Sequence, residues 1–98
     1  MNKFGNLIRS KRESNNMLLR HVSAELDIDT AMLSKIERGE KNAKREHVIL
    51  LSNLFNIDFK QLSSLWLADQ IYQLIQNEEQ ALKAVEIVEE ELKQIYRK

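Results

Sequence analysis

The side chains of this chain that could read DNA stand at the start of one short predicted helix. Residues 22–39 indicate two short helices joined by a tight turn, an arrangement that can present the start of its second helix to the major groove. A lysine there can donate to guanine, a threonine methyl or an alanine can pack on a thymine methyl, and a serine suits either kind of partner. The alternative is that Thr30 and Ala31 are ordinary first-turn residues and that Met32 fills the core. The candidates for base reading are Thr30, Ala31 and Met32, with Ser34 and Lys35 about one turn further along the helix.

Basic side chains on both sides of this helix could bind phosphates. Each lysine or arginine that neutralises a phosphate releases counterions, so binding through such a cluster weakens as salt is added. The alternative for each residue taken alone is a solvated surface charge. The candidates for phosphate binding are Arg9, Arg12, Arg38, Lys41, Asn42, Lys44 and Arg45. Glu37 would repel phosphates, so we expect it to form an ion pair with an arginine of the first helix.

Other kinds of chemistry lack the residues that they need. His21 and His47 have no carboxylate or second histidine at ligand spacing, and Gly5 and Gly39 form no glycine-rich phosphate loop. The chain has no cysteine, which excludes disulfides and cysteine zinc sites and fits a cytoplasmic protein. No segment approaches the about 20 apolar residues of a membrane span. We therefore expect no catalysis, metal, cofactor or membrane association, and the sequence indicates no small-molecule ligand.

Composition and charge indicate a small all-α protein with a basic first half. The 98 residues include no proline and two glycines, and 43% are hydrophobic, with many strong helix formers. Residues 1–47 carry ten Lys or Arg against seven Asp or Glu, whereas residues 48–98 carry five against eight. The basic half suits a nucleic acid, and the acidic half should turn away from it. A chance imbalance on solvated helix faces is the alternative.

Hydrophobic periodicity predicts six helices separated by turn and capping residues. Asp29 is expected to cap the third helix, Gly39 to end it in a left-handed conformation, and Asp58 to cap the fifth. Asn77 begins a further capping signal, NEEQ, which predicts a break before the last helix. The expected helices span residues 3–14, 18–26, 30–38 and 45–55, followed by one that starts after Asp58 and one that runs from about 78 nearly to Lys98.

The segment Leu33–Gly39, LSKIERG, together with Val48–Ile57, carries a family resemblance. Through these motifs, residues 4–62 resemble the lambda-repressor-like helix-turn-helix domain of the Cro/C1 (XRE) transcriptional regulators. The resemblance implies a five-helix domain that binds double-stranded DNA, with Thr30, Ala31 and Lys35 at base-reading positions. We expect a DNA-binding domain over residues 1–62 and a helical extension over residues 63–98. The extension looks like that of small restriction–modification controllers.

The start of the second helix departs from the family pattern. Leu19 stands at the position where the family often has a phosphate-binding glutamine, so the resemblance marks it as a phosphate-binding position. Leu18 replaces the usual Ser or Thr cap, and Asn16 is a candidate substitute for that cap. Asp27 replaces the turn glycine, and aspartate is among the residues that tolerate a left-handed conformation.

Apolar residues at alternating spacings of three and four continue through the acidic extension: Ile71, Leu74, Ala81, Val85, Val88, Leu92 and Ile95. Such a seam can pack against a second helix, and so it predicts a homodimer. A dimer also suits DNA binding, because one such domain covers too few base pairs for specific binding. Folding of the last helix against the fifth is the alternative. Leu50 and Trp66 join the expected interface, with packing inside the chain as their alternative. The predicted interface comprises Leu50, Trp66, Ile71, Leu74, Val85, Val88, Leu92 and Ile95.

The sequence therefore predicts a sequence-specific DNA-binding regulator that acts as a homodimer on an operator, as a repressor or an autoregulator. The alternative function is a protein-interaction or antitoxin-type module that keeps the same fold and binds a partner protein through its acidic last helix. The leucines at positions 18 and 19 favour that alternative.

Overall fold

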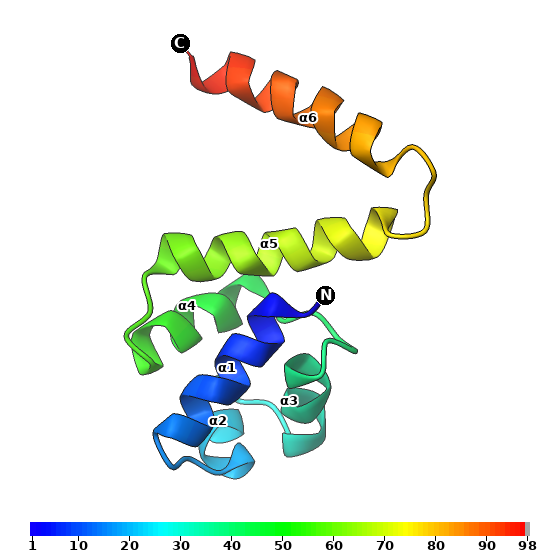
Figure 1. Cartoon of the computed structure of the whole chain (residues 1–98). Coiled ribbons are helices and arrows are strands. Elements are labelled where there is room, and N and C mark those ends of the chain that lie inside the picture. Colours follow the sequence, from blue (N-terminus) through cyan, green and yellow to red (C-terminus); the bar gives the residue numbers. More distant parts are fainter. Residues whose placement is uncertain (98) are drawn as a thin grey trace.

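The computed structural model describes residues 1–97, and this part of the chain forms six α-helices (Figure 1). They are α1 (Lys3–Ser14), α2 (Leu19–Leu26), α3 (Thr30–Glu37), α4 (Arg45–Leu54), α5 (Phe59–Ile75) and α6 (Ala81–Tyr96). The all-α prediction is confirmed, and the expected bounds of the first four helices agree to within one residue. Among residues 1–97, none of the helices combines the length and the apolar character that a membrane span needs.

The first five helices share one hydrophobic core. Its completely buried side chains include Ile8 of α1, Val22 of α2, Leu33 of α3, Val48 and Leu51 of α4, and Leu62 of α5. Burying one such side chain contributes about 1.5–3 kcal/mol relative to leaving it in water. Each helix is therefore held by at least one of these residues, and together they fix the position of α3 at the surface.

Left-handed residues end four of these helices. Asp27 follows α2 with a φ of 54°, and Gly39 follows α3 with a φ of 77°, as the sequence predicts. Asn16 and Asn56 take the same conformation after α1 and α4, with φ values of 55° and 51°. The left-handed conformation of Asp27 turns the chain sharply after α2. As a result, only three residues, 27–29, connect α2 to α3.

Side-chain oxygens and imidazole nitrogens cap the helix starts. Asp29 accepts the N–H of Met32 at 2.7 Å, and Asp58 accepts that of Gln61 at 3.1 Å, so both predicted caps are confirmed. The suggestion that Asn16 caps α2 is wrong. The Nδ1 of His21 accepts the N–H of Leu18 at 3.0 Å and takes over part of that role.

The fifth helix reaches back across the domain to the start of α1. Asp69 accepts the N–H of Lys3 at 3.0 Å through Oδ1 and the N–H of Phe4 at 2.8 Å through Oδ2. The boundary expected between residues 62 and 63 thus falls inside one continuous helix, and the contacts of the first five helices extend at least to Asp69.

The sixth helix stands apart from the other five (Figure 1). It begins at Ala81 with Gln80 as its N-cap, so Asn77 is not the cap that the sequence suggested. Residues 76–80 instead form an irregular connection. No residue of α6 is buried, and all but Ala81 are exposed. Lys98, near which the last helix was expected to end, lies outside the described residues.

Candidate nucleic-acid interface

The start of α3 lies at the end of the molecule opposite α6 (Figure 1). The side chains of Thr30 and Ala31 are exposed there, and that of Lys35 is exposed in the last turn of the same helix. Their backbone is fixed from below, because Leu33 and Ile36 on the other face of α3 are buried in the core. The three residues that the resemblance places at base-reading positions therefore share one accessible surface.

The other two base-reading candidates are partly engaged by the protein itself. Met32 is half-buried and packs against the core. Ser34 is half-buried too, and its Oγ accepts a hydrogen bond from the guanidinium of Arg38. The hydroxyl of Ser34 thus has one acceptor position occupied by Arg38 and keeps its O–H donor, whereas Lys35 has no ion-pair partner among residues 1–97.

Arg12 is engaged by the protein itself. Its guanidinium forms a two-pronged pair with Glu37 of α3, at 2.8 Å through Nε and 3.0 Å through Nη2, and its Nη1 donates to the carbonyl of Met17. The side chains of Arg12 and Glu37 are only 12% and 4% exposed. The ion pair expected for Glu37 is confirmed, and the same pair argues against a phosphate contact by Arg12, which stays an untested prediction.

The hydrogen bond with Glu37 raises the pKa of the Arg12 guanidinium above its ordinary value, although burial offsets part of the shift. The pair therefore stays charged and joins α1 to the last residue of α3. Its role is to hold the recognition helix on the domain.

Three other arginines of the phosphate set have partners within the chain. Arg9 pairs with Glu13 at 2.7 Å, and Arg38 pairs with Glu40 at 2.6 Å. These pairs are more than half exposed, so they can exchange for a phosphate at small cost. Arg45 lies over the ring of Trp66, with 5.1 Å from its Cζ to the ring centroid.

The loop between α3 and α4 supplies the remaining polar candidates. Lys41 and Lys44 are exposed, and neither forms an ion pair with any residue from 1 to 97. Asn42 is exposed and accepts a hydrogen bond from Gln73 at 3.1 Å. Together with Lys35, the two lysines form the part of the predicted site whose ammonium groups are unpaired.

Leu19 cannot bind a phosphate through its side chain. That side chain is half-buried and packs against the core, while Leu18 before it is 50% exposed. Only the backbone is left for an anion at this helix start, because the first N–H groups of a helix lack intrahelical acceptors. The prediction that Leu19 binds a phosphate can therefore apply only to its backbone N–H and not to its side chain.

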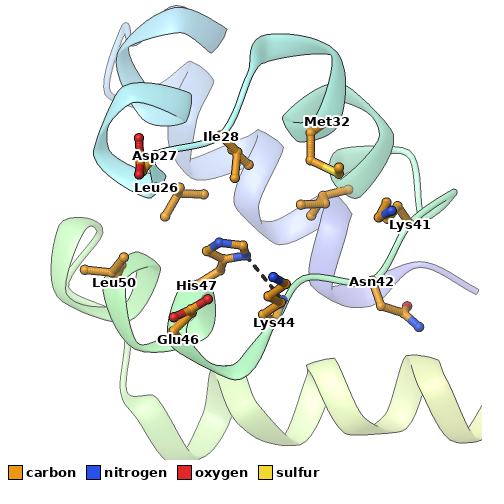
Figure 2. Close-up of a pocket in the computed structure, with 11 residues that line it drawn as sticks. Leu26, Asp27, Ile28, Met32, Lys41, Asn42, Lys44, Glu46, His47 and Leu50 are labelled. Atoms are coloured by element: carbon orange, nitrogen blue, oxygen red, sulfur yellow. Dashed lines mark hydrogen bonds between the residues drawn. The ribbon is translucent and has the colours of Figure 1, made fainter.

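A hollow of about 470 Å³ lies between the α2–α3 turn and the start of α4, next to the candidate DNA-binding surface (Figure 2). Its apolar lining includes Ile28, Met32 and Leu50, and the buried ring of His47 stands among them with its Nδ1 bonded to the N–H of Lys44. Leu50 is 43% exposed and so is not covered within the chain. The sequence analysis named Leu50 as an interface residue, and Met32, Lys41, Asn42 and Lys44 as DNA contacts, but it did not predict that they line one hollow.

The predicted dimer residues fall on separate surfaces. Trp66 is half-buried, and its indole N–H donates to the carbonyl of Ala43 at 2.8 Å, so it serves the five-helix core. Leu50 lines the hollow beside α3. The other six, Ile71, Leu74, Val85, Val88, Leu92 and Ile95, are exposed on the end of α5 and on α6.

This fold and surface define a helix-turn-helix domain. A family model described as helix-turn-helix matches residues 8–62, and the chain belongs to this family, of the Cro/C1 (XRE) type. It is a family of DNA-binding transcription regulators and not one of enzymes. The chain matched no curated protein and no solved structure in the corresponding comparisons.

Proposed function

We propose that this regulator binds a specific operator as a homodimer and represses transcription there or controls its own gene. The observation that carries the proposal is the accessible face of α3, with Thr30 and Ala31 exposed at its start and Lys35 exposed in its last turn. Lys41 and Lys44 follow in the next loop, and neither pairs with a carboxylate among residues 1–97. In this proposal Thr30 and Ala31 pack on thymine methyls, and Lys35 donates to a guanine.

Phosphate contacts would set the register of the domain on the duplex. Lys41 and Lys44 are the first residues to supply them, because no internal pair has to break. Arg9 and Arg38 would exchange their exposed carboxylate partners for phosphates. Two such domains on neighbouring half-sites would multiply the affinity and read a two-fold related sequence.

Fluorescence anisotropy on the DNA upstream of the gene, repeated at two salt concentrations, tests the proposal. Lys35→Ala should lower affinity for the specific site by about 1–3 kcal/mol and leave binding to unrelated DNA almost unchanged. Lys44→Ala should weaken binding to every duplex alike and reduce the salt slope by about one. Lys83→Ala, which removes an exposed lysine of α6, is the matched control and should change neither.

The exposed Leu18 at the start of α2 favours a second candidate, a protein-interaction module on the same fold. That candidate predicts weak binding of equal strength to every duplex, with no effect of Lys35→Ala on specificity. The same anisotropy experiment therefore decides between the two functions.

A further inference from the structure

Exposed apolar side chains gather on the end of α5 and on α6. Of fifteen large hydrophobic residues that are exposed, eleven lie between positions 67 and 96. Leu74, Leu82 and Tyr96 reach 80%, 84% and 82% exposure. A single monomer rarely shows so large an apolar region unless another molecule covers it.

These side chains form a groove between the two helices. The groove has a volume of about 410 Å³, and Glu89 is the one charged residue among its lining residues. The others are apolar: Ile71, Leu74 and Ile75 from α5, and Ala84, Val85, Val88 and Leu92 from α6. The two helices of one chain thus face each other without filling the space between them.

The apolar surface of α6 is wider than this groove uses. Leu82 and Ile87 do not line it, and they are 84% and 58% exposed on its flanks. A helix that needs one neighbour has a narrow apolar stripe, whereas a helix inside a bundle has a broad one. The width of the stripe therefore indicates two neighbours for α6.

The monomer leaves α6 without support. The radius of gyration is 15.3 Å, against about 13 Å for a compact domain of this length. Isolated helices shorter than about 12–15 residues are marginal in water, and α6 is only slightly longer, with 16 residues and none of them buried. A contact outside the single chain would supply the missing stabilisation.

We propose that the groove between α5 and α6 holds α6 of a second copy, and that the first copy's α6 fills the second copy's groove in return. The inference rests on the proposed function for its biological purpose, since it specifies how the homodimer is made. The two hairpins would interlock as a four-helix bundle with two-fold symmetry. Both α3 helices would remain free, because each lies at the opposite end of its chain (Figure 1).

The available area supports a second copy. A stable interface removes about 800 Å² of surface from each partner, and the exposed parts of the eleven side chains amount to on the order of 1,000 Å². An interlocked bundle would cover most of them at once, including Leu82 and Ile87.

The lining of the groove favours an apolar helix over a basic partner protein. Glu86, Glu89 and Glu90 pair with Lys83, Lys93 and Arg97 of the same helix, at 3.7, 3.3 and 3.9 Å. These pairs are more than half exposed, so they contribute little to the choice of partner. Glu89 is the one charged residue of the lining, and the apolar stripe of α6 suits the other lining residues.

Sedimentation velocity of the full chain tests the interface without DNA. The wild-type chain should sediment as a dimer at micromolar concentration, and Val88→Asp should raise its dissociation constant by at least about tenfold, because it puts a charge into the apolar groove. Arg97→Gln makes the same change in net charge on the polar face of α6, away from both the groove and Ile87, and should leave the constant nearly unchanged. A monomeric wild-type chain, or equal behaviour of the two variants, would overturn the inference.

Disulfide trapping identifies the occupant, and the chain suits it because it has no cysteine of its own. A tagged Ile71→Cys chain mixed with an untagged Leu92→Cys chain should form a disulfide between the two chains under mild oxidation. Closure of α6 onto its own α5 would instead give a disulfide only within the doubly substituted chain, and that result would refute the exchange. This assay also decides the question if Val88→Asp impairs folding.

The two proposals can fail separately. Specific operator binding by a chain that stays monomeric would refute the interlocked dimer and the homodimeric part of the proposed function, while operator recognition itself would stand. A disulfide-trapped dimer that binds every duplex with equal affinity would refute the operator function and support the proposed interface.

Discussion

Asp69 of α5 caps the first turn of α1, where its Oδ2 accepts the N–H of Phe4 at 2.8 Å. The residue at the N-cap position of α1, Asn2, makes no side-chain cap, because its Nδ2 donates to the carbonyl of Glu37 at 2.8 Å. One carboxylate from the middle of α5 thus satisfies two N–H groups that would otherwise lack partners. The helix that leads to α6 is in this way bonded to the domain that carries α3.

Asp69→Ala should lower the free energy of unfolding by about 2–4 kcal/mol, since it leaves two N–H groups unpaired at a buried site. Urea denaturation followed by circular dichroism measures the loss. Asp58→Ala removes an exposed cap of α5 and should cost only about 1 kcal/mol. Equal losses for both variants would mean that Asp69 is an ordinary cap.

Gly5→Ala should destabilise the protein, although the same change inside most helices stabilises by about 0.5–1 kcal/mol. A Cβ at position 5 would lie 2.5 Å from the carbonyl oxygen of Glu37 and 2.6 Å from that of Ile36, and both are backbone atoms. We expect a loss of about 1–3 kcal/mol from the forced separation of α1 and α3. Ser10→Ala on the exposed side of α1 is the control in the same thermal melts and should be neutral or slightly stabilising.

The predictable parts of this molecule are those encoded locally. Periodic apolar residues placed the helices, and Asp29, Asp58, Asp27 and Gly39 act within a few positions of themselves, so their roles could be inferred from the sequence. The sequence also predicted that Glu37 pairs with an arginine of the first helix, because a carboxylate would repel phosphates.

The missed features depend on distant contacts. Asp69 reads as a surface residue of an amphipathic helix, and only the packing of α5 on α1 brings it to Phe4. Arg12 matches a phosphate contact in residue type, but the fold buries it against Glu37. Asn77 does not cap a helix, and α6 has no buried residue, so no buried contact favours an earlier start of this helix.

Arg12→Ala should lower the free energy of unfolding by about 3–5 kcal/mol, because the carboxylate of Glu37 would stay buried without its partner. Denaturant titration measures this loss, with Arg9→Ala at the exposed pair as the control that should change little. At low temperature, where the variant remains folded, its DNA salt slope should match that of the wild type. A slope lower by about one would return Arg12 to the phosphate set.

Glu13 should titrate below an ordinary glutamate. The hydrogen bond from Arg9 lowers the pKa of this carboxyl, so the pair stabilises the fold above the ordinary glutamate pKa and loses that effect as pH falls through the lowered value. Carboxyl chemical shifts followed by NMR should show the low midpoint, and Arg9→Ala should return it to the usual range. An unchanged midpoint in that variant would show that the pair is not formed in solution.

Arg45 is expected to act both on Trp66 and on DNA. Its guanidinium lies 5.1 Å from the centroid of the indole ring, and this exposed stacking is worth about 0.5–1 kcal/mol. The stack also holds the charge at the start of α4, next to the loop that contains Lys44, so a phosphate could bind its outer side.

Arg45→Ala should therefore change the fluorescence of Trp66 without DNA and reduce the salt slope of DNA binding by about one. Arg45→Lys keeps the charge and loses the planar group, so it should restore the slope but not the fluorescence. If Arg45→Ala alters the fluorescence and leaves the slope unchanged, the arginine serves packing alone, and the phosphate contacts of this loop rest on its lysines.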